Sequence, residues 1–303
     1  MSVRDLSTSR TAVVLRRRAA ALALASFATV LGSWYLMVLT RRGQLVEQAA
    51  ISGSFIGARF VSSQARTLLS VVSMPVAVAL VLAILVVGLW GSARRRAWWA
   101  AAVVVAVNVS TQVLKHWVLT RPDYGVSLRY DGANTLPSGH TAMAASAAVA
   151  LVLVVGPAWR GAAAWAGAVL AALMGYSTLV CQWHRPADVV AAIALAVGWA
   201  SVAVACGAWH SPADLAVPGR SAAGGADGVA RRARHPRHLR VLTRAGIAAG
   251  VIGTVLMAVT WIRLEDAASR TTSFVAYVGG AAGTVAVAFL GLGLLAGLGR
   301  PRS

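Results

Sequence analysis

Two histidines in this sequence lie beside groups that would equip them for nucleophilic or acid–base chemistry. The first, His184, precedes Asp188 by four residues, and Pro186 between them predicts that a helix begins there. Because residues four apart share a helical face, the carboxylate would fix the tautomer of the imidazole and raise the basicity of its other ring nitrogen. Such a pair suits a nucleophile or a proton carrier, although a pair of this kind also occurs as a simple helix-end hydrogen bond.

The second histidine ends the run Pro137-Ser138-Gly139-His140, which directly precedes an apolar, alanine-rich segment. This order predicts Ser138 at the N-cap of a helix and Gly139 in its first turn, where free N–H groups and the positive helix end bind anions such as phosphate. His140 would then exchange a proton beside that anion near neutral pH. The alternative is that Ser138 only caps the helix and His140 faces lipid headgroups.

A third group of candidates is cationic. Lys115 is the one lysine among 28 basic residues, and it lies six residues before Arg121. Two cations at this place would neutralise a phosphoryl group, and the guanidinium fork would hold two of its oxygens. Both side chains could instead extend to lipid headgroups. A chain that otherwise uses only arginine would fill that role with arginine, which favours a chemical role for Lys115.

The elements that position these residues are predicted to be membrane spans. The chain is 58% hydrophobic and 12% charged, with a mean hydropathy of +0.70, which excludes an ordinary soluble domain. A span needs about 20 apolar residues, and the first such run is too long for the core of a signal peptide. We therefore expect an all-α, polytopic membrane helical bundle. Eight spans are predicted, at residues 19–40, 69–91, 97–118, 139–156, 158–179, 187–207, 245–262 and 274–298.

The basic residues predict the orientation of these spans. With both termini in the cytoplasm, most of the 28 basic residues face the cytoplasm, as the positive-inside rule requires. The connection at 41–68 and the loops at about 116–138 and 179–187 then lie outside. The net charge of +19 is explained by this bias and by anionic lipid, and no aromatic residue lies among the arginines of the basic loop to suggest a nucleic-acid partner.

The same pattern divides the chain into four parts. They are a cytoplasmic basic N-terminus at 1–18, a six-span core at 19–207, a cytoplasmic basic loop at 208–244, and two further spans with a short tail at 245–303. The two cysteines, Cys181 and Cys206, lie at opposite ends of one predicted span and cannot pair. No spacing of Cys or His suggests a metal site.

Taken together, these residues resemble the type 2 phosphatidic acid phosphatase superfamily, integral-membrane lipid phosphatases with an active site related to that of vanadium haloperoxidases. The signatures of the family are K-x6-R-P, P-S-G-H and S-R-x5-H-x3-D. The second is intact at 137–140. The first is matched by Lys115, Arg121 and Pro122, with five intervening residues in place of six.

The third signature is matched by Ser177, His184 and Asp188 with the family spacing, but Thr178 occupies the position of the arginine. In the family this arginine contacts the phosphate. A hydroxyl group can donate one hydrogen bond there but brings no charge. Two other arginines predicted on the outer face are candidates to supply the missing cation: Arg185 and Arg129.

The resemblance implies a mechanism without a metal or other cofactor. His184 would attack phosphorus to form a phosphohistidine, Asp188 would orient His184, and His140 would protonate the leaving oxygen. The phosphoryl oxygens would be held by a further set of groups: the side chains of Lys115 and Arg121 and the backbone N–H groups of Ser138 and Gly139. Water would then hydrolyse the intermediate.

The expected function is hydrolysis of a lipid phosphate or isoprenoid pyrophosphate at the outer face of the plasma membrane. Membrane lipid and the lipid phosphate substrate are the expected partners, and the sequence does not indicate an oligomeric state. Two alternatives remain open. The same phosphohistidine could pass its phospho group to an acceptor alcohol, or the chain could be a degenerate protein that binds a lipid phosphate without turning it over.

Overall fold

The computed structural model describes residues 3–71, 79, 81–84, 86, 94–126, 133–209, 226–264 and 269–299. Over these ranges the chain forms helices and no strands, and six of the helices are long and apolar enough to cross a membrane. The predicted all-α polytopic bundle is confirmed. The predicted span at 69–91 lies largely outside the described residues.

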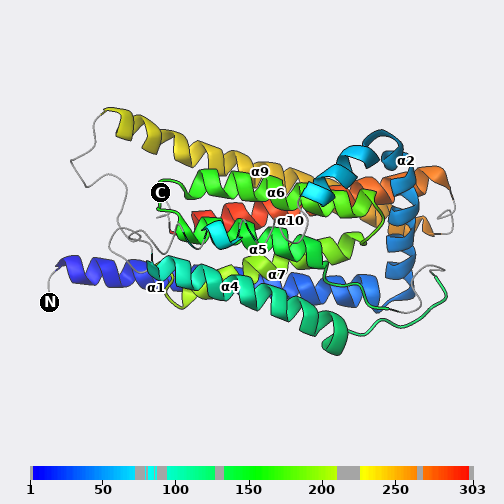
Figure 1. Ribbon diagram of the computed structural model, residues 1–303, viewed down its shortest axis with the longest axis horizontal. Helices are drawn as coiled ribbons and strands as arrows, with labels where there is room; N and C mark the ends of the chain where they lie inside the picture. The colour runs from blue at the N-terminus through cyan, green and yellow to red at the C-terminus, as the bar shows by residue number, and fades with distance from the viewer. Residues whose placement is uncertain are drawn as a thin grey trace.

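The described helices follow the predicted order, and most of them run along the long axis of the molecule (Figure 1). They are α1 (Val3–Ser33) with a π-helical turn at Trp34–Val38, α2 (Arg41–Val71), α4 (Arg94–Val113) with a π-helical turn at Leu114–Val118, α5 (Gly139–Val154), α6 (Arg160–Val180), α7 (Pro186–Ala205), α9 (Ala226–Ile262) and α10 (Arg270–Gly297). Helix α5 has 16 residues and is shorter than a typical span.

The two ends of the helical bundle differ in the residues that they carry. At one end, α4 and α6 finish and α5 and α7 begin; we call this the motif end, because it holds Leu114–Val118, residues 119–126, 133–140 and 181–188. At the opposite end lie the beginning of α1 and the end of α10, on the left in Figure 1. All three sequence motifs therefore meet at one end of the bundle.

Helix α2 is an element that the sequence pattern did not predict, since residues 41–68 were expected to be an outer connection. It packs against α10 and α6. Figure 1 shows its first part running across the motif end, where the other long helices run lengthwise. Helix α2 therefore lies over the loops that carry the motifs.

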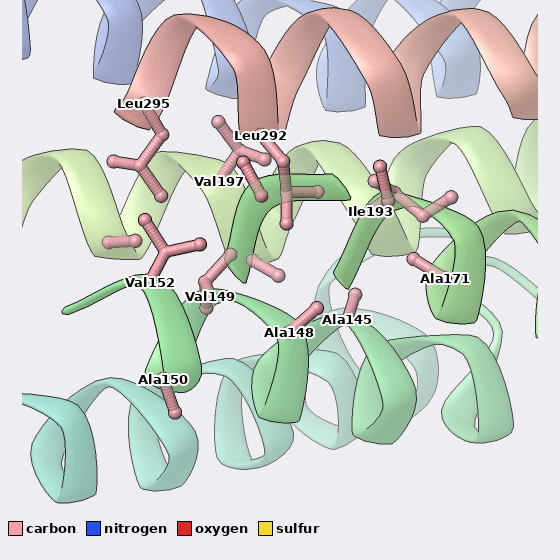
Figure 2. Close-up of a cluster of buried hydrophobic side chains, with 14 of the residues drawn as sticks. Ala145, Ala148, Val149, Ala150, Val152, Ala171, Ile193, Val197, Leu292 and Leu295 are labelled. Atoms are coloured by element: carbon pink, nitrogen blue, oxygen red, sulfur yellow. The ribbon is translucent and has the colours of Figure 1, made fainter. Parts of the chain in front are cut away.

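Helix α7 is the centre of the core. In the most apolar 18-residue stretch of α7, 83% of the residues are buried inside the protein, whereas in the corresponding stretch of α9 only 17% are buried. Figure 2 shows Ile193 and Val197 of α7 packed between residues of α5 and the side chains of Leu292 and Leu295 from α10. Since α7 begins at the motif end, the best-packed helix of the bundle carries Asp188 of the third motif.

Glycine lets α6 and α10 approach α7 closely. A Cβ atom at Gly175 of α6 would overlap Val189, and one at Gly280 of α10 would overlap Pro186 in the first turn of α7. Helix α10, which the sequence placed outside the six-span core, thus contributes to the same core. The division of the chain at 244 and 245 remains a prediction.

Candidate active site

The start of α7 and the turn just before it hold the carboxylate and the histidine together: Asp188 lies in the first turn of the helix, and His184 lies two residues before Pro186, where the helix begins. His184 Nδ1 lies 3.2 Å from Asp188 Oδ2, and the same oxygen accepts the backbone N–H of Arg185 at 3.0 Å. Asp188 is 1% exposed, whereas the side chain of His184 is 10% exposed. A buried carboxylate therefore fixes one face of an imidazole whose other nitrogen is left for chemistry.

Backbone hydrogen bonds to the end of α6 fix the turn that carries His184. Helix α6 ends in a Schellman motif, in which the N–H of Trp183 bonds to the carbonyl of Thr178 at 2.9 Å and the N–H of Gln182 to that of Leu179 at 3.0 Å. Gln182 takes the left-handed position of the motif, with φ of 59°. A glycine usually occupies this position, and a side chain there is strained, as is common near functional sites.

The second motif begins α5 in the manner that its sequence predicts. Ser138 is the N-cap of the helix and its hydroxyl accepts the N–H of Thr141 at 3.4 Å, while its own N–H donates to the backbone carbonyl of Asp188 at 3.0 Å. Beside Gly139 the space is open, since an added Cβ would meet only the side-chain nitrogen of Gln112, at 4.0 Å. An anion could therefore approach the backbone here.

His140 connects this helix with the turn that carries the third motif. Its ring centroid lies 5.5 Å from that of Trp183, and His140 is close enough to His184 and Lys115 to interact with their charges. The two histidines thus face one region of the motif end. One is held by a carboxylate and the other lies beside a cation.

The cations of the first motif lie on the same side. Lys115 sits in the π-helical turn that ends α4, and the side chain of Asn134 donates to its backbone carbonyl at 3.2 Å. Lys115 lies within electrostatic range of Asp188. Burial and the charge of Arg185 lower the pKa of Arg121, and the charge of Asp188 opposes that change. The first and third motifs therefore share one electrostatic environment.

Thr178, which replaces the family arginine, and the two arginines that could supply the missing cation differ in their surroundings. Thr178 is fully buried and donates its hydroxyl to the carbonyl of Gly175 at 2.7 Å, within its own helix. Arg185 is 2% exposed, and its Nη1 donates to the hydroxyl of Thr135 at 3.0 Å, in the loop before the second motif. Arg129 lies outside the described residues. Arg185 is thus the candidate cation that the structure places near the motifs.

Two further polar residues of the motif end come from α2, and the sequence motifs did not point to them. Glu47 is 1% exposed, and its carboxyl oxygens accept the N–H of Ala187 at 3.2 and 3.4 Å. Gln44 donates to the carbonyl of Pro122 at 2.8 Å. A signal was present in the sequence, because Gln44 and Glu47 lie three residues apart and share one face of a helix.

The described part of the chain contains no group of three or more His, Cys, Asp or Glu residues that could hold a metal ion.

Comparison with known proteins identifies the segment that forms this site. A sequence model of the PAP2 superfamily matches residues 96–212, which include all three motifs and helices α5, α6 and α7. No curated protein and no solved structure matches the chain. Residues 96–212 are therefore similar to the PAP2 superfamily, the type 2 phosphatidic acid phosphatase superfamily that the three motifs resemble.

Proposed function

We propose that this membrane protein is a phosphatase that hydrolyses a lipid phosphate or an isoprenoid pyrophosphate at the outer face of the plasma membrane. The match of residues 96–212 to the PAP2 superfamily supports phosphatase-type activity on a membrane lipid phosphate. The observation that carries the finer proposal is the bond between His184 and the buried Asp188, at the end of the bundle where His140 and Lys115 also lie.

In the first step, His184 acts as the nucleophile. The proton stays on Nδ1 of His184, in a hydrogen bond to Asp188, so that Nε2 carries the free lone pair. This lone pair attacks phosphorus, a P–N bond forms and the P–O bond to the lipid breaks. His140, in its protonated form, gives a proton to the leaving oxygen. The products are the lipid alcohol, or the lipid monophosphate when the substrate is a pyrophosphate, and a phosphohistidine.

In the second step, water releases the phosphate. His140, now neutral, accepts a proton from the water as its oxygen attacks phosphorus, and the P–N bond breaks with its electron pair returning to Nε2 of His184. Inorganic phosphate leaves, and both histidines are back in their starting states. Over the whole cycle His140 therefore gives up one proton and regains one, and His184 ends in the protonation state in which it began.

The cations stabilise the charge that develops on the phosphoryl oxygens. Phosphoryl transfer depends mainly on positioning and charge neutralisation, which Lys115, Arg121 and the N–H of Gly139 would supply. The N–H of Ser138, which the sequence also assigned to the phosphate, is instead donated to the carbonyl of Asp188. We assign to Arg185 the part of the arginine that Thr178 replaces in the third motif. Its burial beside Asp188 strengthens its interaction with an incoming phosphate, because the local dielectric is low.

The place of the site favours an amphiphilic substrate. Two tryptophans border the motif end, Trp117 with 82% and Trp183 with 48% of their surface exposed. Exposed tryptophans gather at the level of lipid headgroups, so the motif end would lie where the phosphate of a bilayer lipid lies. The bias of basic residues in the sequence favours the outer face for this end.

The test is phosphate release by the purified protein in liposomes from a panel of lipid phosphates and isoprenoid pyrophosphates, with His184→Ala as the comparison. We expect release by the wild type, no release above background by the variant, and an acid-labile phosphoprotein when the wild type is quenched rapidly with labelled substrate. Equal activity of the two proteins would overturn the mechanism.

The same assay separates the two other functions. Formation of a new phosphoester when an acceptor alcohol is added, in place of free phosphate, would identify a transferase. Saturable binding of lipid phosphate without release or transfer would identify a non-catalytic binder.

A further inference from the structure

One face of α2 presents polar side chains to the motif end. Gln44, Glu47 and Ser54 are spaced by three and seven residues, which places them on one side of a helix, and they are 2%, 1% and 1% exposed. Three buried polar groups on one face of a helix with no signature of its own need a reason, because each must find a partner when it leaves water.

Each of the three contacts a different part of the site. Gln44 donates to the carbonyl of Pro122 in the first motif at 2.8 Å, and Ser54 accepts a hydrogen bond from the side chain of Gln182 at 3.2 Å. Glu47 accepts the N–H of Ala187, between His184 and Asp188, at 3.2 and 3.4 Å. Helix α2 therefore holds the loop of the first motif and both sides of the turn that carries His184.

Glu47 has the most consequential of these contacts. The N–H of Ala187 is one of the groups at the start of α7 that have no partner within the helix, and it is buried. Without an acceptor, this N–H would pay its desolvation cost uncompensated. The turn could then relax, and the neighbouring Asp188 and His184 would move with it.

The charge state of Glu47 fits a role as an acceptor. Burial, together with the charge of Asp188, raises the pKa of Glu47 to about 8, although Arg185 and Arg121 oppose this rise. Near neutral pH the carboxyl group is therefore mostly protonated. Its carbonyl oxygen accepts from Ala187, and no second negative charge is placed beside Asp188.

We propose that Glu47 is a positioning residue of the phosphatase, which holds the first turn of α7 through Ala187 so that His184 and Asp188 face the cations of the first motif. This inference rests on the proposed function, because positioning matters for turnover only if His184 is the nucleophile. Gln44 supports the same arrangement by holding Pro122, next to Arg121.

Two substitutions separate positioning from mere occupancy of the site. Both substitutions are neutral, but Glu47→Gln keeps an oxygen that can accept the N–H of Ala187, whereas Glu47→Ala removes the acceptor. We expect Glu47→Ala to lower kcat on the order of 10²-fold with little change in KM, as displacement of a catalytic group does, and Glu47→Gln to recover most of that loss at pH 7. Equal loss in both variants, or full turnover by a folded Glu47→Ala protein, would overturn the proposal.

The positioning can also be measured without turnover. Hydrogen exchange of the backbone over residues 182–190 should be faster in Glu47→Ala than in the wild type and close to wild type in Glu47→Gln. Ser54→Ala and Ser52→Ala form a matched pair, because Ser54 is buried against Gln182 and Ser52 is exposed on the same helix. We expect faster exchange in Ser54→Ala and none of this effect in Ser52→Ala.

These two measurements distinguish the failure of each proposal. A wild-type protein that releases no phosphate from any substrate would remove the proposed function, and the exchange data would still report whether Glu47 holds the turn. Unchanged exchange over residues 182–190 in Glu47→Ala would overturn the positioning role, even in a protein that is an active phosphatase.

Discussion

Two buried arginines at the two ends of the bundle are almost equally hidden from solvent but have different surroundings. Arg160 is 3% exposed at the opposite end, and its guanidinium lies 3.7 Å from the ring centroid of Trp209. Arg185 is 2% exposed at the motif end, within electrostatic range of Asp188, Glu47 and Arg121. Burial of an arginine therefore does not define its role; its neighbours do.

The same contrast extends to other cations. At the opposite end, Arg96 donates to the carbonyl of Val155, the residue that ends α5, at 3.0 Å, and Trp209 donates to the carbonyl of Leu153 at 3.2 Å. These contacts satisfy carbonyl groups at the end of a helix. At the motif end, Lys115 and Arg121 lie near carboxyl groups and imidazoles, an arrangement suited to a phosphate.

The strongest test of this contrast is to remove each arginine. Arg185→Ala should lower phosphate release by about 10²–10³-fold, the usual effect of losing one group that stabilises transition-state charge. Arg160→Ala should lower the thermal midpoint in detergent through loss of a cation–π contact while the turnover of the folded fraction stays near that of the wild type. Both variants are compared by kinetics and by thermal unfolding. The contrast fails if the two have the same effect on turnover.

A second test asks whether the buried site at the motif end raises the pKa of Glu47. Burial and the charge of Asp188 raise the pKa of Glu47 from 4.5 to about 8, while Arg185, the N–H of Ala187 and Arg121 oppose this rise. Over this interval the folded state keeps a proton that the unfolded state has lost, so wild-type stability should fall as the pH rises from about 4.5 to about 8.

Glu47→Gln provides the reference for that measurement, because an amide does not titrate. The gap in thermal midpoint between the variant and the wild type should widen, in favour of the variant, as the pH rises from about 5 to about 8, and then stay constant. A gap that does not change with pH would show that Glu47 is not a buried proton carrier.

A smaller effect is expected at the position where the family has an arginine. Because the hydroxyl of Thr178 already bonds to the carbonyl of Gly175, Thr178→Val should cost about 1 kcal/mol of stability and leave turnover close to that of the wild type. Thr178→Arg should destabilise the protein, since this position is fully buried and closely packed. A large loss of turnover in a stable Thr178→Val protein would return Thr178 to the phosphate site.

The weakest signal should come from labelling the two ends in intact cells. A single-cysteine protein with Cys181 should react slowly with a membrane-impermeant maleimide, because this residue at the motif end is only partly exposed. A protein with only Cys206, which is exposed at the opposite end, should react only after the cells are permeabilised. The reverse pattern would place the motif end in the cytoplasm.

Much of the fold was predictable because its signals are local. Apolar runs marked the spans at α4, α6 and α7, and the order Ser138-Gly139 marked the start of α5. Helix α2 escaped the same search because Arg41, Arg42 and Glu47 interrupt its apolar residues. A helix that lies across the end of a bundle need not be apolar throughout, so hydropathy alone does not reveal it.

The site was predictable to the extent that its residues are adjacent in the sequence. The contact of His184 with Asp188 joins residues close in the sequence, although His184 lies just before α7 and not on its helical face, whereas the contact between Glu47 and Ala187 joins residues far apart in the chain. No pattern in a single sequence predicts such a contact. The direction of the Thr178 hydroxyl was also hidden, because it depends on the packing of α6 against its neighbours.

The packing of α2 against α10 has a consequence for the order in which the protein is completed during membrane insertion. A Cβ atom at Gly53 would overlap the backbone of Ser273, and Ala49 and Ala50 pack against Ala276, so α2 rests on α10, the final helix of the described chain. The ribosome delivers the motif segments well before it delivers α10. The contact of Glu47 with α7 is therefore secured only once α10 has been inserted, and a partly synthesised chain would carry every signature residue with an unfinished candidate site.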